Sequence, residues 1–230
     1  MLDWPLVPRP PEKKMTGESP SLAQLSAIAD PFVRELAALG RLRSYPKNTV
    51  FITEGDSSDS VFVVLSGRVK TFLSDTEGHE MILDTQGPGE YVGEMALDGK
   101  PRSASVMTLE SSTFAVVLRE PIKEAIRRNP DFALDMISKI IDRARLATNS
   151  VKDLALLDVY GRVARLLLNM AVETNGKLEI PEKLTQQEIA ERVGASRDMV
   201  SRIFRDLTAG GYITVESRHI TINKKPPARW

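Results

Sequence analysis

The segment LTQQEIAERVGASRDMVSRIFRDLTAGGYI, residues 184–213, decides how the C-terminal part of this chain folds. Thr185 and Glu188, three residues apart, have the pattern of a capping box at a helix N-terminus. The apolar face of that first helix consists of Ile189, Ala190 and Val193. Gly194 suits a tight turn, and Ser196 suits the N-cap of a second helix. The spacing predicts two short helices joined by a glycine turn.

The second predicted helix has a polar face whose chemistry suits a DNA groove. Its expected buried positions are Met199, Val200, Ile203 and Leu207, and its expected outward residues are Arg197, Asp198, Ser201, Arg202 and Arg205. Arginine donates to guanine O6 and N7, a carboxylate accepts from cytosine N4, and hydroxyls contact phosphates. The following YITVESRHITI, residues 212–222, predicts two short strands around a turn. Together they indicate a winged helix-turn-helix that binds double-stranded DNA, rather than an ordinary helical hairpin.

Charge and composition support this division of the chain. Residues 160–230 carry 12 Lys and Arg against 8 Asp and Glu, whereas residues 1–159 carry 19 against 23. A basic C-terminal part is typical of a nucleic-acid partner. The chain has no Cys and only two His, His79 and His219. We therefore expect no disulfide, no iron–sulfur cluster and no metal site.

The middle of the chain has the pattern of an antiparallel β protein. Segments such as SVFVVLSGRVKTFLSD, residues 60–75, and SASVMTLESSTFAVVL, residues 103–118, are rich in Val, Phe and Thr and are separated by glycine-containing turns. Short strands at this spacing predict an antiparallel sandwich or β-roll. One or two short helices are expected at 21–40, and the roll is assigned to 21–130.

The N-terminal segment, residues 1–20, is rich in proline and has no apolar run of a secretion signal. We expect it to be a disordered extension. No stretch approaches the roughly 18 apolar residues of a membrane span, so we expect no membrane association and a cytoplasmic location.

A long helix is predicted at residues 131–158. Asn129 suits its N-cap and Pro130 its first position. A narrow apolar seam follows, formed by Ile137, Ile140, Ala144, Ala147, Val151 and Leu154. A seam with alternating spacings of three and four favours pairing with a second copy, although packing on its own sheet is the alternative. Asp158 and Gly161 are residues at which a helix can break, so we place a hinge there, followed by a DNA-binding domain at 159–230.

The stretch GEMALDGKPRSASV, residues 93–106, lies between two strand-like segments and has the chemistry of a phosphate and ribose site. Glu94 can accept a hydrogen bond from a ribose 2′-OH, Arg102 can clamp a phosphate, and Ser103 can add a donor. A short helix beginning near Gly93 would present free backbone N–H groups. The expected ligand-binding residues here are Gly93, Glu94, Met95, Arg102, Ser103 and Ala104. The alternative is an ordinary surface loop.

Through these motifs, residues 22–222 resemble the cyclic AMP receptor protein family, the catabolite-activator type of bacterial regulator in the Crp/Fnr superfamily. The most specific pieces are GEMAL…PRSASV, LALLDVYGR and LTQQEIAERVGASRDMVSR. The resemblance implies an α+β fold with an N-terminal β-roll, a long dimerisation helix and a C-terminal winged helix-turn-helix. It also implies a homodimer, cyclic AMP as ligand, and RNA polymerase as a further partner.

The resemblance also assigns residues by position. It makes Arg197, Asp198 and Arg202 base readers and Thr185 a phosphate contact. Gln186, Ser196 and Ser201 complete the expected DNA-contacting set. The pair of hydroxyls that meets the adenine in the family stands here as Ala147 and Thr148, which leaves Thr148 as the base contact.

Three alternatives remain open for the sequence. The ligand could be cyclic di-GMP, whose second phosphate would need Arg143, Arg145 or Lys152. The chain could bind DNA without any nucleotide, with the stretch at 93–106 retained only as structure. The third alternative, a cupin-type enzyme, needs clustered metal-binding histidines, and the roll holds only His79. We therefore expect no enzymatic activity.

Overall fold

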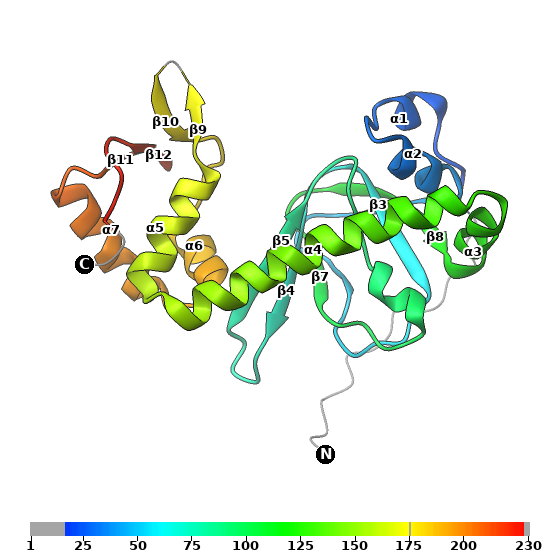
Figure 1. Cartoon of the computed structure of the whole chain (residues 1–230), viewed down its shortest axis with the longest axis horizontal. Helices are drawn as coiled ribbons and strands as arrows, with labels where there is room; N and C mark the ends of the chain where they lie inside the picture. The colour runs from blue at the N-terminus through cyan, green and yellow to red at the C-terminus, as the bar shows by residue number, and fades with distance from the viewer. Residues whose placement is uncertain (1–16, 175, 228–230) are drawn as a thin grey trace.

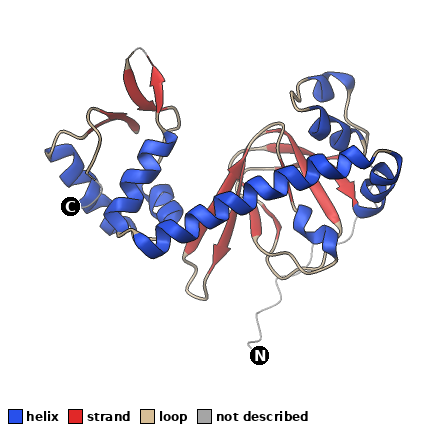
Figure 2. Cartoon of the chain, in the orientation of Figure 1, coloured by secondary structure: helices blue, strands red, loops and turns tan. Residues whose placement is uncertain are grey.

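The computed structural model describes residues 17–174 and 176–227. It has a β-roll, a long helix that runs from the roll toward the C-terminal part, and a smaller helical domain with its own sheet (Figures 1 and 2). This architecture confirms the predicted fold class. Residues 1–16, which make up most of the expected N-terminal extension, lie outside the described residues.

Two helices precede the roll: α1 (Leu22–Ser26) and α2 (Pro31–Ala38). Asp30 caps α2 by accepting hydrogen bonds from two backbone N–H groups of its first turn. The backbone carbonyl of Glu18 accepts a hydrogen bond of 2.8 Å from the backbone N–H of Leu42, and Pro20 is buried. Residues 17–20 therefore lie against the roll, and the expectation of a loose extension as far as residue 20 is wrong for them.

The roll consists of two antiparallel four-stranded sheets. One has the order β1 (Arg41–Tyr45), β8 (Ser112–Leu118), β3 (Ser60–Ser66), β6 (Tyr91–Val92). The other has the order β2 (Val50–Ile52), β7 (Ser105–Thr108), β4 (Val69–Ser74), β5 (Glu80–Gln86). Both sheets bury the β-branched and aromatic side chains that predicted them: Ile52, Phe62, Val64, Val69, Val92, Val106, Phe114 and Val116 form one cluster. The alternation of buried and exposed side chains in the strands thus produces a closed core.

Helix α3 (Arg119–Arg128) leads into the long helix α4 (Pro130–Leu156). Asn129 caps α4 by accepting from the backbone N–H of Asp131 at 3.2 Å, and Pro130 occupies the first position, as predicted. Phe132 and Met136 are buried against the roll. These two side chains fix the first turns of α4 to the roll, and the helix runs on toward the C-terminal domain (Figure 1).

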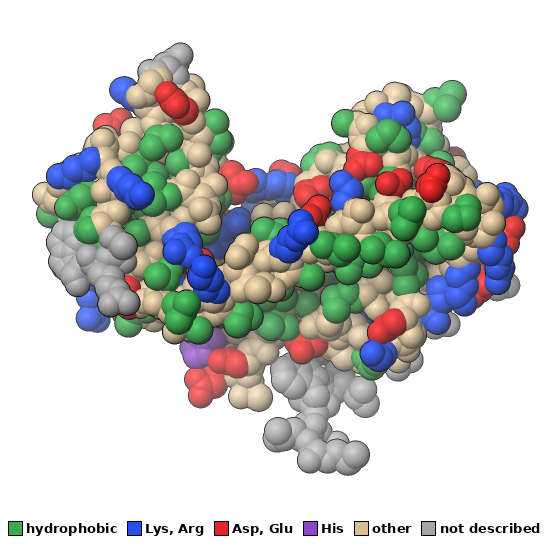
Figure 3. Space-filling model, in the orientation of Figure 1, with side chains coloured by type: hydrophobic (Ala, Val, Ile, Leu, Met, Phe, Trp, Pro, Cys, Tyr) green, Lys and Arg blue, Asp and Glu red, His purple; other side chains and the backbone are tan. Residues whose placement is uncertain are grey.

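The predicted seam of α4 is exposed in this chain. Ile137, Ile140, Val151 and Leu154 have exposed fractions of 50%, 43%, 65% and 41%. Figure 3 shows hydrophobic side chains gathered along the outer face of the long helix. The alternative prediction, that this seam packs on the chain's own sheet, is therefore wrong.

Between α4 and α5 (Val159–Met170) the chain turns at Leu157 and Asp158, where the backbone is extended. The Asp158 side chain caps α5 by accepting from the backbone N–H of Gly161 at 2.7 Å. Gly161 itself is buried inside the first turn of α5. The predicted break is confirmed at Asp158, but Gly161 is not a break point because the cap holds it in the helix.

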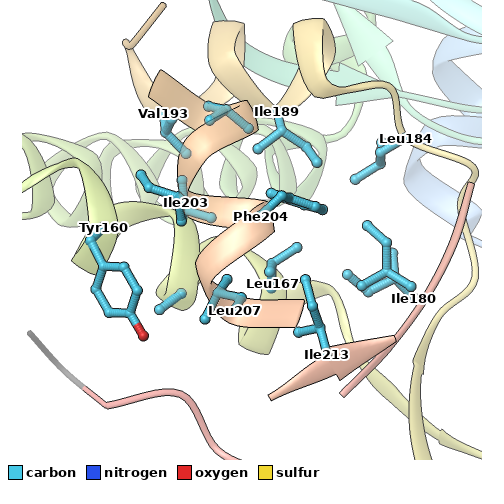
Figure 4. Close-up of a cluster of buried hydrophobic side chains, with 14 of the residues drawn as sticks. Tyr160, Leu167, Ile180, Leu184, Ile189, Val193, Ile203, Phe204, Leu207 and Ile213 are labelled. Carbon is cyan, nitrogen blue, oxygen red and sulfur yellow. The ribbon is translucent and has the colours of Figure 1, made fainter. Parts of the chain in front are cut away.

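The C-terminal domain packs three helices on a four-stranded sheet. It comprises α5, α6 (Gln186–Val193), α7 (Arg197–Ala209) and strands in the order β11 (Ile213–Glu216), β12 (His219–Ile222), β10 (Lys177–Ile180), β9 (Val172–Thr174). Figure 4 shows side chains from the three helices and β11 pointing toward one another, among them Leu167, Ile189, Phe204, Leu207 and Ile213. The two-helix unit and the hairpin of the predicted wing are both confirmed.

Candidate functional site

The stretch at 93–106 folds as a compact cassette between two strands. After β6, Gly93 leads directly into the 3₁₀ helix η1 (Glu94–Asp98), and Arg102 then precedes β7. The short helix expected at Gly93 is therefore present. Gly93 has a φ of +87°, and a Cβ at this position would lie 2.5 Å from Nη1 of Arg102. Only glycine lets the backbone turn here while the guanidinium packs across it.

Arg102 is buried, with an exposed fraction of 5%. Its Nη1 donates to the Gly93 carbonyl at 2.6 Å, and its Nη2 donates to Ser58 Oγ at 2.6 Å and to the Ser60 carbonyl at 2.7 Å. Burial lowers the pKa of the guanidinium, and the nearby carboxylate of Glu94 opposes that shift. From the sequence, Arg102 is expected only to clamp a phosphate. The structure also makes Arg102 part of the framework of the cassette.

Glu94 is also buried, with an exposed fraction of 8%, and its carboxylate contacts a residue of the long helix. Nη1 of Arg143 lies 2.6 Å from Glu94 Oε2. The same guanidinium donates to the Tyr91 carbonyl and lies over the Tyr91 ring, with Cζ 4.7 Å from the ring centroid. The ion pair connects the cassette to α4. The sequence indicates Arg143 only as an optional cation for a second phosphate, and no local pattern indicates its pairing with Glu94.

The remaining cassette residues fall into two groups. Met95 is 62% exposed, and Ser103 Oγ lies 3.2 Å from Met95 Sδ at the exposed side of the cassette. Ala104 is 9% exposed and directly precedes β7. Gly93 and Arg102 thus share one hydrogen bond and Met95 and Ser103 another, whereas Glu94 is paired with Arg143 of α4. The exposed Ser103 hydroxyl lies where a ligand can reach it.

Thr148 is separated from the cassette. It is exposed on α4, and its hydroxyl donates to the Ala144 carbonyl one turn earlier at 2.9 Å. Five residues separate it from Arg143, which is a rotation of about 140° around a helix with 3.6 residues per turn. Thr148 therefore lies on a different side of α4 from the residue that contacts this chain's own cassette, and beside the exposed seam.

The helix-turn-helix presents its predicted polar residues on one surface. Arg197, Asp198 and Arg202 are exposed, and Ser201 is half-buried. Ser196 caps α7 by accepting from the backbone N–H of Met199 at 3.3 Å. Gly194 has a φ of +60°, the left-handed conformation that the turn requires. The predicted turn and N-cap are both confirmed.

The capping box at the start of α6 is present. Glu188 N–H donates to Thr185 Oγ1 at 3.1 Å, and Thr185 N–H donates to Glu188 Oε2 at 2.7 Å. Thr185 and Gln186 are half-buried and line a hollow of about 490 Å³ together with Arg197. The two helices of the unit therefore meet at one concave surface.

One residue of α7 is placed wrongly by the sequence. Met199 was expected in the core but is 45% exposed, whereas Phe204, which was not predicted, is 6% exposed. The buried face of α7 runs through Val200, Ile203, Phe204 and Leu207. These positions have the spacing i, i+3, i+4, i+7, and Met199 falls at the edge of that face.

The wing contributes a cation that the sequence analysis did not single out. Strands β11 and β12 pair with Glu216 opposite His219, and the two turn residues Ser217 and Arg218 have φ values of 49° and 69°. Arg218 lines the same hollow as Arg197. Its position at the tip of a predicted wing is the signal that would have identified it.

Two absences hold for the residues that the structure describes. None of their helices is long and apolar enough to cross a membrane. They also include no group of three or more His, Cys, Asp or Glu that could hold a metal ion.

A β-roll with a buried Glu and Arg cassette, joined by a long helix to a winged helix-turn-helix, defines a transcription regulator with a nucleotide-binding domain. Residues 42–129 match the family model of the cyclic nucleotide-binding domain, and residues 161–226 match the Crp-like helix-turn-helix domain. The chain belongs to the Crp/Fnr superfamily of cyclic nucleotide-binding transcription regulators.

Its relatives include well-described regulators. The cAMP-activated global transcriptional regulator CRP of Salmonella typhimurium is 30% identical over 198 residues, covering 84% of this chain and 94% of that protein. A CRP-like cAMP-activated global transcriptional regulator of Mycobacterium tuberculosis is 30% identical over 184 residues, covering 78% and 82%. The structure of the c-di-GMP-responsive global regulator CLP of Xanthomonas campestris superposes with a TM-score of 0.72 at 25% identity, covering 84% of this chain and 99% of that one.

Proposed function

We propose that this chain is a homodimeric, ligand-gated transcription regulator that binds a 3′,5′-cyclic mononucleotide, with cyclic AMP the preferred ligand. The observation that carries the proposal is the cassette, in which buried Glu94 and Arg102 flank Gly93 and an arginine of α4 contacts Glu94. One cation, one carboxylate and an exposed hydroxyl match one phosphate and one ribose.

Each cassette residue has a defined part in this proposal. Arg102 supplies the positive charge for the phosphate, and exposed Ser103 adds a hydroxyl donor beside it. Glu94 accepts the ribose 2′-OH, and its ion pair with Arg143 orients the carboxylate. Ala104 leaves room for the ligand to approach the start of β7.

Thr148 is the proposed contact to the base, across the dimer seam. It lies on a different side of α4 from Arg143, so it is directed toward the cassette of the partner subunit when two copies pair through α4. Ala147 offers no side-chain hydrogen bond, and one neutral hydrogen bond contributes about 0.5–1.5 kcal/mol. We therefore expect a preference for cyclic AMP over cyclic GMP of about tenfold or less.

The ion pairs that Arg143 and Arg145 of the long helix already form favour a mononucleotide ligand over cyclic di-GMP. Arg143 is engaged with Glu94. Arg145 is 76% exposed and lies 3.7 Å from Asp142. A second phosphate would have to compete with Glu94 for Arg143 or order an exposed side chain. The cAMP-activated relatives support the same choice, and the c-di-GMP-responsive relative keeps the second ligand in the test.

The proposal includes a dimer on palindromic DNA. Pairing through α4 would remove from water the apolar seam that one chain leaves exposed. A two-fold dimer would present two copies of α7, so its operator should contain half-sites about 10 base pairs, or roughly 34 Å, apart. The DNA contacts are Thr185, Gln186, Ser196, Arg197, Asp198, Ser201 and Arg202. RNA polymerase is the proposed protein partner, and the cytoplasm the proposed location.

Calorimetric titration of the purified chain with cyclic AMP, cyclic GMP and cyclic di-GMP tests the ligand. The proposal expects one cyclic AMP per chain and weaker binding of cyclic GMP. Tight cyclic di-GMP binding without cyclic AMP binding would overturn the choice of ligand. Binding of none of the three, with DNA binding retained, would favour a regulator that acts without a nucleotide.

A further inference from the structure

A buried lysine joins the β-roll to the DNA-binding domain. The Lys70 side chain on β4 is 7% exposed, and Nζ contacts two carboxylates. One belongs to Glu80 on β5 of the same sheet. The other belongs to Glu191 on α6, whose Oε2 lies 3.3 Å from Nζ and whose side chain is 13% exposed. A single cation is thus shared between two domains.

The burial of this pair distinguishes it from a surface ion pair. Exposed pairs are screened by water and contribute little, whereas an uncompensated charge at a buried position is strongly unfavourable. Lys70 Nζ also lies 5.1 Å from the centroid of the Phe72 ring, which limits the space around the charge. If α6 moved away from the sheet, Lys70 would lose one of its two partners and Glu191 would lose its cation.

A second ion pair follows the same interface. Arg68, directly before β4, lies 3.1 Å from Glu182, in the segment that leads into α6. Glu182 is also 3.7 Å from Arg192 of α6. These side chains are more exposed than Lys70, so Arg68 and Glu182 form the edge of the contact and Lys70 its centre.

The sheet that carries Lys70 is continuous with the cassette. Strand β7 begins three residues after Arg102 and pairs with β4, with Ser105 opposite Phe72 and Met107 opposite Lys70. Backbone hydrogen bonds therefore connect the strand that follows the cassette to β4, the strand whose Lys70 contacts α6. This route does not pass through α4 or the turn at Asp158.

We infer that Lys70 is a positioning residue that fixes the helix-turn-helix against the roll and carries nucleotide occupancy from the cassette to α6. The inference rests on the proposed function and deepens it, because it assigns part of the gating to a contact within one subunit. The roll then acts on the DNA-binding domain through two connections, the helix α4 and the β4–α6 contact.

Glu191→Gln and Glu80→Gln form a matched pair of test variants. Each neutralises one carboxylate beside the same lysine, but only Glu191→Gln removes the charge that crosses between the domains. We expect Glu191→Gln to lower the ratio of DNA affinities with and without cyclic AMP by about fivefold or more, with cyclic AMP affinity unchanged. Glu80→Gln should keep the wild-type ratio. Equal ratios in both variants would overturn the inference.

Two further measurements separate this inference from the proposed function. In a double-mutant cycle, Lys70→Met combined with Glu191→Gln should change the ratio no more than Lys70→Met alone. Hydrogen exchange without nucleotide gives an independent readout: Glu191→Gln should speed exchange in both β5 and α6, and Glu80→Gln only in the sheet. If wild-type protein shows no nucleotide response, the proposed function fails, and unchanged exchange in α6 of Glu191→Gln would refute the contact itself.

Discussion

Two arginine sites in this chain serve different proposed ligands and are built in opposite ways. Arg102 in the cassette is 5% exposed and donates to two serines and a glycine of the roll. Arg197 at the start of α7 is exposed, and within the described part of the chain no hydrogen bond or ion pair engages its guanidinium. The first arginine is held by the fold, and the second is held only by its helix.

The difference follows from what each site has to bind. A buried cation whose position is already fixed loses little conformational entropy when it meets a small phosphate. An exposed arginine on a rigid helix can adjust to base edges and phosphates. It distinguishes between bases through the geometry of its hydrogen bonds. Substitution should therefore affect stability and ligand affinity together at Arg102, but DNA recognition alone at Arg197.

The largest expected effect is that of Arg102→Leu. Removing one side of a buried charge pair costs about 2–5 kcal/mol, so cyclic AMP affinity should fall about 30-fold to several thousand-fold. The Ser60 carbonyl would also lose its donor, so the free energy of unfolding should fall by about 1–3 kcal/mol. Calorimetry and urea unfolding measure the two effects.

Arg102→Lys sharpens this prediction, because it keeps the charge but not the fork of donors. It should retain more affinity than the leucine variant and still be less stable than wild type. Wild-type affinity in a folded Arg102→Leu variant would remove the phosphate role of the cassette.

Arg197→Ala should weaken operator binding by about 1–3 kcal/mol per half-site and relax the preference at one base position. Its stability and nucleotide affinity should match wild type. Arg205→Ala is the control, because Arg205 is also exposed but lies two turns further along α7. It should weaken binding without changing base preference. Thr185→Ala is a less specific test of a DNA contact, because Thr185 also caps α6.

Asp158→Ala tests the connection between α4 and α5. Loss of the N-cap should lower the free energy of unfolding by about 0.5–2 kcal/mol. We also expect DNA affinity without nucleotide to change, because the turn at Leu157 and Asp158 sets the direction of α5. Anisotropy titrations without nucleotide measure this. A variant with altered stability but wild-type DNA affinity would confine Asp158 to a capping role.

The smallest expected effect is at Thr148. Thr148→Ala should weaken cyclic AMP binding by about 0.5–1.5 kcal/mol, the contribution of one neutral hydrogen bond. Thr148→Ser keeps the hydroxyl and should bind nearly as wild type. Calorimetry with both variants decides whether this hydroxyl contacts the base, since equal affinities for all three proteins would exclude it.

Local patterns in the sequence predicted most of the fold. The capping box at Thr185, the cap at Asn129 and the glycine turn at Gly194 were each read from neighbouring residues, and each is present. The seam of α4 was identified from its spacing alone. These features depend on contacts within a few residues, so a single sequence contains them.

The features that could not be predicted from the sequence depend on contacts between residues far apart in the chain. Burial of Arg102 depends on Ser58 and Ser60, more than 40 residues earlier, and Glu94 meets Arg143 from another element. The contact between Lys70 and Glu191 crosses two domains. Met199 and Gly161 are predicted wrongly for a local reason. In the sequence, a position at the edge of a helix face, such as Met199, differs little from a core position. A position in the first turn after a cap, such as Gly161, differs little from a residue at which a helix breaks.

We expect nucleotide binding in the roll to change DNA binding by the helix-turn-helix. The most direct test is fluorescence anisotropy of a labelled palindromic operator, titrated with purified protein with and without saturating cyclic AMP at fixed salt. We expect tighter binding with cyclic AMP, by about 5- to 150-fold, the usual range of a coupling free energy. Equal affinities under both conditions, with cyclic AMP bound, would contradict it.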